Sequence, residues 1–226
     1  MGQGIGVPAV SGNGGTMQSR YAIYSHGMRV GELTAIRALV PWDNAQALQF
    51  KARTRVDADF LVYCYNLDNE EEAFIGERGT VRYSRKTREN GKELRVDGRL
   101  DGDRFLLRIS GNGSVRSMVV ERSRYDHTTM ECPEIAMKRE GEELTLRLLD
   151  LETLMVVNRR YRWEKSEDVT VDGRKIRCRV VTFEDCNKKC RRWIAPDGSG
   201  ALIVRQDGTG KDGSYSLRLT KLMNGS

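Results

Sequence analysis

The fold of this chain is decided by the stretch Val81-Arg82-Tyr83-Ser84-Arg85-Lys86-Thr87-Arg88-Glu89-Asn90-Gly91-Lys92-Glu93-Leu94-Arg95-Val96. Runs with alternating apolar and polar residues lie on both sides of Asn90-Gly91. An Asn-Gly pair tolerates the positive φ angles that a two-residue hairpin turn requires. The stretch therefore predicts two antiparallel strands joined by a tight turn.

The same signal recurs along the chain, so we expect a mainly β protein built from antiparallel hairpins. Residues 78–124 should supply three or four strands, and residues 21–40 a first hairpin. Residues 47–65 predict a long strand with a bend at Asp57-Ala58-Asp59. The further turn signals are Asp101-Gly102, Gly111-Asn112-Gly113, Asp172-Gly173, Asp197-Gly198 and Asp212-Gly213.

Three further segments need separate treatment beside this pattern of alternating strands and tight turns. Residues 126–143 contain Cys132-Pro133 and a charged stretch, and could hold one short helix. Residues 148–157 form a short apolar run that fits a strand or a helix, because such runs do not reveal their period. The last strand carries Tyr215, Leu217 and Leu219 on one face, and we expect it to close or edge the sheet.

The length of 226 residues suits one domain with a real core. Residues 1–19 contain six glycines and no charge, so we expect a flexible leader there and a single β domain over residues 20–223. No run approaches the ~18 apolar residues of a membrane helix, which predicts no transmembrane segment. A basic region followed by an apolar one is lacking, so we expect no signal peptide within this sequence.

The net charge of +6 raises the question of nucleic-acid binding. The basic residues are scattered among apolar and acidic ones, which is typical of a solvated strand face. We therefore expect no nucleic-acid partner. The arginines concerned are Arg95, Arg99, Arg104, Arg108, Arg116, Arg122 and Arg124.

No candidate catalytic motif in the sequence has the context that its chemistry requires. Residues 208–213 match G-x-G-x-x-G, but a strand pattern follows them where a dinucleotide site needs a helix, so we interpret them as a hairpin turn. His26 precedes a turn glycine, and His127 has no recognisable nucleophile motif nearby. Glu70-Glu71-Glu72 fits a solvated charge run. We predict no catalytic residue, no cofactor and no metal.

Five cysteines leave several alternatives open. Cys64 and Cys178 alternate with apolar neighbours and are expected to point inward. Cys186 and Cys190 flank a predicted hairpin loop and form the candidate disulfide. Neighbouring lysines and arginines would also favour a reactive thiolate. A zinc site formed by His127, Cys132, Cys186 and Cys190 would have unusual spacings, and unpaired thiols are the remaining alternative.

An ordered set of residues across residues 20–222 resembles exported bacterial domain-of-unknown-function families. Their curved antiparallel sheet is related in shape to the lipoprotein-carrier (LolA-like) fold. The motifs are Tyr21-x-x-Tyr24-x-x-Gly27-x-x-Val30-Gly31-Glu32, Tyr125-Asp126, Leu149-Asp150-Leu151, Val171-Asp172-Gly173, Arg192-Trp193-Ile194-x-x-Asp197-Gly198 and Gly213-x-Tyr215-x-Leu217-x-Leu219.

The resemblance implies a highly curved antiparallel sheet or half-open β-barrel, in the periplasm or cell envelope, and it brings no catalytic residues. From it we expect a noncatalytic envelope protein that binds a lipid or another amphipathic molecule on the concave face. The alternative is a structural or interaction module that pairs with an envelope protein through a sheet edge. An enzyme ranks third. A lipocalin fits less well, because the first strand lacks a G-x-W signature.

Overall fold

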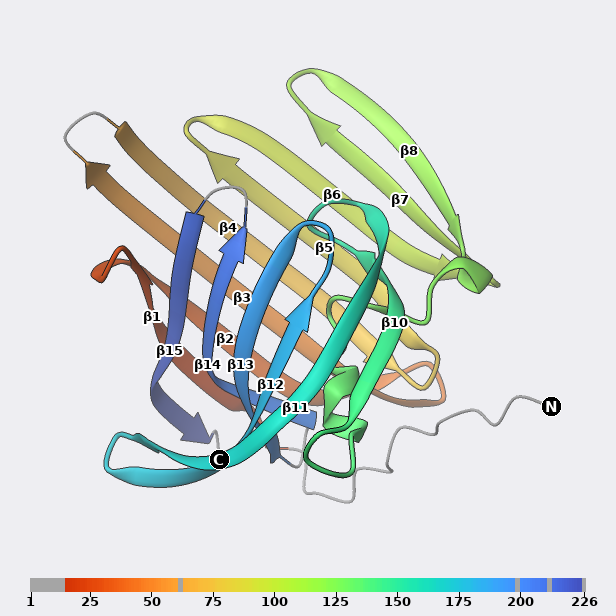
Figure 1. Cartoon of the computed structure of the whole chain (residues 1–226). Coiled ribbons are helices and arrows are strands. Elements are labelled where there is room, and N and C mark those ends of the chain that lie inside the picture. Colours follow the sequence, from red (N-terminus) through yellow and green to blue (C-terminus); the bar gives the residue numbers. More distant parts are fainter. Residues whose placement is uncertain (1–14, 61–62, 198–199, 211–212, 225–226) are drawn as a thin grey trace.

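The computed structural model describes residues 15–60, 63–197, 200–210 and 213–224. These residues form one 15-stranded sheet with two short 3-10 helices, so the mainly β prediction is confirmed (Figure 1). The elements in chain order are β1 (Met17–Ser25), β2 (Met28–Trp42), β3 (Ala45–Phe60), β4 (Tyr63–Gly76), β5 (Gly79–Glu89), β6 (Lys92–Asp101), β7 (Arg104–Gly111), β8 (Ser114–Glu121), η1 (Arg122–Arg124), β9 (His127–Thr128), η2 (Pro133–Ala136), β10 (Glu143–Asp150), β11 (Met155–Val171), β12 (Arg174–Glu184), β13 (Lys188–Asp197), β14 (Gly200–Gly210) and β15 (Gly213–Asn224).

The sheet order runs from β8 down to β1, then from β15 down to β9. The first and last strands pair in the middle, with Tyr21 opposite Leu219. The expectation that the last strand closes or edges the sheet is therefore wrong. β15 lies between β14 and β1, and the two ends of the sheet are β8 and β9.

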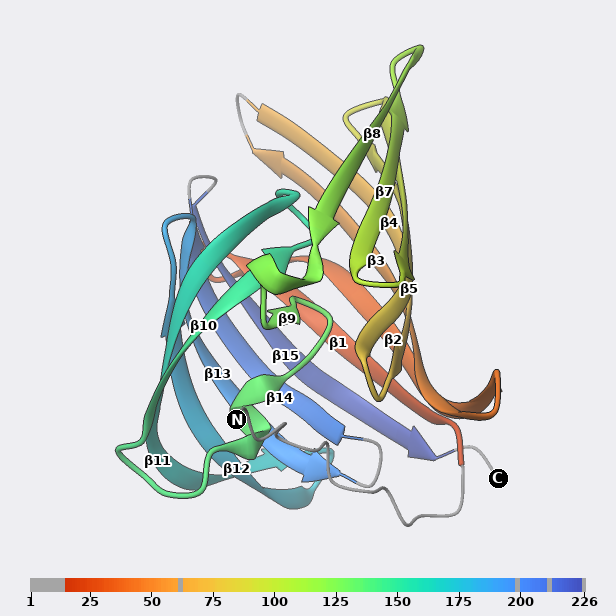
Figure 2. The same ribbon diagram turned by 90° about the vertical axis from the view of Figure 1, so that its right-hand side faces the viewer.

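The sheet is strongly curved. Strands β10–β14 form one wall, strands β3–β8 form the other, and the connection through residues 122–142 lies between them (Figure 2). All strand pairs are antiparallel except β9 with β10. The short helix expected within residues 126–143 is present as η2, which spans only Pro133–Ala136.

Most turns form where the sequence predicts them. Asn90 and Gly91 have φ angles of 48° and 81°, and Asn112 and Gly113 have 50° and 76°. The predicted bend at Asp57-Ala58-Asp59 is not observed, because β3 pairs with β4 without interruption through these residues. β1 begins at Met17, within the expected leader, because Met17 already pairs with strands on both sides. Residues 1–14 of that leader lie outside the described residues.

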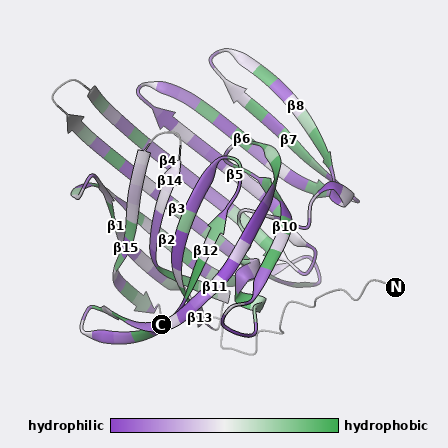
Figure 3. Ribbon diagram, viewed as in Figure 1, coloured by the Kyte–Doolittle hydropathy of each residue, from purple (hydrophilic) through white to green (hydrophobic). Residues whose placement is uncertain are grey.

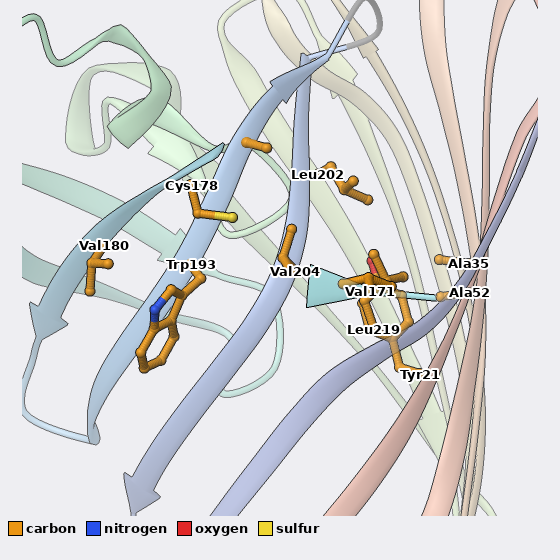
Figure 4. Packing of buried hydrophobic residues seen from close by; sticks show 11 residues of the cluster. Tyr21, Ala35, Ala52, Val171, Cys178, Val180, Trp193, Leu202, Val204 and Leu219 are labelled. Carbon is orange, nitrogen blue, oxygen red and sulfur yellow. The ribbon is translucent and has the colours of Figure 1, made fainter. Parts of the chain in front are cut away.

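Hydrophobic and hydrophilic residues alternate along the strands, and three buried clusters result (Figure 3). One cluster joins the two walls, because Leu149 of β10 and Leu151, just after β10, pack with Tyr83 of β5 and Phe105 of β7. A second brings Val171, at the tip of the β11–β12 hairpin, together with Tyr21 and Leu219 (Figure 4). The third surrounds Met137, which follows η2.

Candidate functional site at the open edge of the sheet

Strand β8 ends the sheet on one side. Among the described residues its only neighbouring strand is β7. Met118 and Val120 belong to the face that packs on the core, opposite Leu107 and Phe105 of β7. The other face carries Val115, whose exposed fraction is 60%, and Val119, at 52%. Two large apolar side chains are therefore in water on the strand that has a free side.

The backbone of β8 offers hydrogen-bonding groups to that free side. Asn112 and Gly113 form a two-residue turn, and Gly111 pairs with Ser114 across it. The residues that flank such a turn exchange both hydrogen bonds, and hydrogen-bonded pairs alternate along a hairpin. The even-numbered residues therefore bond to β7, and the odd-numbered residues from Val115 to Glu121 direct their N–H and C=O groups outward.

A hollow of about 620 Å³ lies beside this edge, toward the turns of the β5–β6 and β7–β8 hairpins. Its apolar lining comes from Leu94, which is partly exposed, and from Ile109, which is buried. Lys92 and Arg116 supply positive charge. Ile109 and Arg116 are cross-strand partners, so the hollow opens on the core-facing side of β8. Its other lining residues are Thr87, Glu89, Asn90, Glu93, Gly111, Asn112 and Ser114.

Acidic side chains also line this hollow and offset part of its positive charge. Glu93 forms an ion pair with Arg88, which holds the pKa of the Glu93 carboxyl below its usual range. Glu89 also lines the hollow. The hollow therefore combines apolar and charged surface, with its cationic groups on β6 and β8.

A second hollow, of about 640 Å³, lies over β2–β6. Its lining is dense with charges of both signs, and several are already paired. Arg53 contacts Asp68 at 2.8 Å and Glu70 at 3.1 Å, and Lys51 contacts Glu72 at 3.4 Å. Exposed pairs of this kind contribute little to stability. This hollow is a charged face, and the solvated charge run that the sequence predicts holds for Glu70 and Glu72 but not for Glu71, which is desolvated and bonds to Tyr83.

Buried charges join β10, β11 and the β12–β13 turn. The carboxylates of Asp150 and Asp185 have no exposed side-chain surface. Arg159 Nη2 lies 2.8 Å from Asp185 Oδ2 and 3.7 Å from Asp150 Oδ2. Lys188 Nζ lies 3.5 Å from Asp150 Oδ2 and 2.8 Å from Glu152 Oε2. Each charge has an opposite charge beside it, which indicates a structural network.

This network extends toward the other wall. Burial raises the pKa of Glu152, but Lys188 and Arg85 outweigh that effect and hold it below its usual range. Arg85 of β5 donates a hydrogen bond of 3.4 Å to the Glu152 carbonyl. Nearby, the Tyr83 hydroxyl donates a hydrogen bond of 2.6 Å to Glu71, whose pKa is raised by burial. Polar contacts therefore accompany the apolar packing between the walls.

The predicted disulfide is not formed in the structure. Cys186 is exposed in the β12–β13 turn, whereas Cys190 is buried on β13, with its Sγ 3.7 Å from the Tyr215 hydroxyl. No disulfide joins any of the five cysteines, all of which the structure describes. Cys178 is buried, as expected, but the inward prediction for Cys64 is wrong. Cys64 is exposed near the end of the β3–β4 hairpin.

The four residues of the hypothetical zinc site are His127, Cys132, Cys186 and Cys190, and the structure does not group them as metal ligands. His127 Nδ1 lies 2.6 Å from Glu131 Oε2. Cys132 precedes η2, and burial raises its pKa to about 12. Within the described ranges, no group of three or more His, Cys, Asp and Glu side chains has the arrangement of a metal site. Of the other motifs considered, His26 lies in the β1–β2 turn, and Gly208 and Gly210 end β14.

Sequence reasoning missed β8 as a site. Its run Ser114-Val115-Arg116-Ser117-Met118-Val119-Val120-Glu121 alternates only weakly, and nothing local to it distinguishes an edge strand from a central one. The scattered arginines are largely exposed, as predicted, and Arg116 alone of them lines the hollow beside β8. The described residues include no helix that is long and apolar enough to span a membrane.

No protein-family model, curated protein or solved structure matches this chain. The resemblance to exported bacterial families with a LolA-like fold therefore stays a prediction.

Proposed function

We propose that this protein is a noncatalytic interaction module that accepts an extended segment of another polypeptide along β8. The observation that carries the proposal is the side of β8 on which no described strand pairs, where outward backbone groups lie beside exposed Val115 and Val119. Strand addition uses such groups for affinity and alternate side chains for specificity. Many proteins protect an edge strand by covering it or by placing charges on it. On β8, the exposed apolar pair leaves the edge suited to pairing.

An added strand would meet different surfaces on its two faces. Its side chains on one face would lie beside Val115 and Val119. Those on the other face would lie beside Arg116 and could enter the hollow that Leu94 and Ile109 line. This arrangement favours a partner segment with apolar residues at alternate positions.

The test is hydrogen exchange with and without a peptide of the sequence of residues 113–122. In the free edge, the amides of Val115, Ser117 and Val119 should exchange fast, while those of Arg116 and Met118 are protected by β7. Saturating peptide should protect the first group. The proposal is contradicted if the peptide leaves these three amides unprotected and they also exchange fast without it.

A matched pair of proline variants sharpens this test. In Ser117→Pro the lost N–H points outward, and proline is tolerated at such positions on edge strands. This variant should fold but lose peptide protection. In Met118→Pro the lost N–H bonds to β7, so that variant should instead lose thermal stability.

A second candidate function is the binding of an amphipathic molecule in the hollow beside β8. Its volume of about 620 Å³ falls within the ~300–1,000 Å³ of ligand sites. Leu94 and Ile109 could contact an aliphatic chain, and Lys92 and Arg116 an anionic head group. Native mass spectrometry with dodecanoate tests this: an adduct weakened by Leu94→Glu, and absent with dodecyltrimethylammonium, is expected. The resemblance to exported families supports a periplasmic or envelope location for both functions.

A further inference from the structure

We propose that the segment bound at the β8 edge is the β8 strand of a second copy of this chain. The two strands run antiparallel, with Ser117 of one copy opposite Ser117 of the other. This inference rests on the proposed function and names its partner. The observations that carry it are the exposure pattern of β8, its charges and the direction of its backbone groups.

Symmetry makes the edge complementary to itself. A two-fold axis normal to the sheet places two copies of β8 side by side and antiparallel, and it keeps each side chain on its own face. Odd-numbered residues then oppose odd-numbered residues. These are the residues whose N–H and C=O groups point outward from β8, so opposing residues can exchange both hydrogen bonds.

The exposed valines select the register. With Ser117 at the centre, Val115 of each copy lies opposite Val119 of the other, which gives two apolar cross-strand pairs. Centring the pair on Met118 would place Val115 opposite the charged Glu121. Centring it on Arg116 would place two guanidinium groups directly opposite each other, which is unfavourable. The register at Ser117 covers all four exposed valines.

The core-facing side of the pair has a weaker complementarity. Arg116 lies opposite Met118 of the second copy, and the two Arg116 side chains occupy diagonal positions across the axis. Like charges at that spacing repel, and salt screens them. The dimer should therefore strengthen as salt concentration rises. Because one eight-residue strand buries less than the ~1,200 Å² of a standard interface, association should be weak, in the micromolar range or above.

Sedimentation equilibrium of the full chain across a wide range of concentrations is the first experiment. A monomer–dimer equilibrium is expected. Ser117→Pro should abolish it, while the matched Ser117→Ala variant should preserve it. Arg116→Gln should strengthen association several-fold at low salt and change it little at high salt. Circular dichroism and thermal unfolding check that each variant folds.

Disulfide trapping tests the register. Opposing residues of a hydrogen-bonded antiparallel pair have Cα atoms about 5.5 Å apart, which a disulfide can bridge. In a chain that also carries Cys64→Ser and Cys186→Ser, the Ser117→Cys variant should form a covalent dimer through that position. Val115→Cys alone should not, but a mixture of Val115→Cys and Val119→Cys chains should.

The outcomes separate this inference from the proposed function. A dimer lost in Ser117→Pro and trapped at position 117 supports both. A monomer that still binds the peptide of residues 113–122 contradicts the inference that the partner is a second copy of this chain. That result remains compatible with the proposed function, the addition of a strand at β8. A monomer that binds no peptide overturns both. A dimer that survives Ser117→Pro, or that fails to link through position 117, overturns the β8 pairing proposed here.

Discussion

Thr80 Oγ1 of β5 lies 2.7 Å from Thr128 Oγ1 of β9, and both hydroxyls also contact Glu131 Oε1, at 3.0 and 3.2 Å. The Thr80 and Thr128 amides donate to the same oxygen at 3.0 and 3.1 Å. β5 and β9 are not neighbours in the sheet order. This carboxylate therefore ties one wall to the strand at the far end of the sheet.

Replacing this carboxylate should loosen the connection between the walls. Glu131→Gln removes the charge that the Thr80 and Thr128 groups and His127 face, and weakening such buried bonds costs about 1–3 kcal/mol. Urea unfolding at neutral pH measures the loss. Glu140→Gln, at an exposed position, is the control and should change stability by less than about 0.5 kcal/mol. An equal loss in both variants would contradict the assignment.

The same carboxylate predicts an acid dependence. Burial raises the pKa of Glu131, but the hydrogen bond from His127 and the Thr128 and Thr80 amides outweigh it and hold the pKa below its usual range. A depressed folded pKa gives stability that is present above about pH 4.3 and is lost as the pH falls through the folded pKa. The stability gap between wild type and Glu131→Gln should therefore shrink on acidification.

The buried Asp185–Arg159 pair should be costly to break. Asp185→Asn leaves the Arg159 guanidinium, which is 5% exposed, without its nearest countercharge. Removing one partner of a buried pair destabilises by about 3–5 kcal/mol, moderated here by Asp150 at 3.7 Å. The matched control is Glu143→Gln, which breaks the exposed pair with Arg160 and should cost at most about 1 kcal/mol. Thermal unfolding of the two variants compares them.

Gly98 on β6 is required by close packing. A Cβ atom there would lie 2.7 Å from Phe105 Cε1 and 3.1 Å from Leu107 Cδ2, and both neighbours are buried. Gly98→Ala should therefore destabilise the fold by about 1–3 kcal/mol. Gly210→Ala is the comparison, since its Cβ would meet nothing closer than 3.5 Å. Similar melting temperatures for both variants would show that the β6–β7 packing tolerates a methyl group.

Thiol labelling should divide the cysteines by position. Cys64 and Cys186 are exposed, so iodoacetamide should modify them first. Burial raises the pKa of Cys178 to about 11 and that of Cys190 above its ordinary value. Cys178 and Cys190 should react at least about 10²-fold more slowly than Cys64 and Cys186. Peptide mass spectrometry of partly labelled protein identifies the sites, and rapid labelling of Cys190 would contradict its placement.

Hairpin formation was predictable because its signals are local. Asn90-Gly91 and Asn112-Gly113 adopt the positive φ angles that their residue types tolerate, and the strands beside them follow. The pairing of β1 with β15 was not predictable in this way. Those strands lie almost a whole chain apart, and their alternation fits many partners equally well.

The sequence by itself determined the strand class, the turns and the short helical interruption, because φ preferences and alternation act between near neighbours. Only the tertiary structure decided that Thr80 meets Thr128, that Cys190 turns inward, and that β8 has β7 as its single strand neighbour in the described part of the chain. Those facts depend on which surfaces the curved sheet brings together. That choice is made by the burial of Leu149, Leu151 and Phe105 between the walls, which no local pattern encodes.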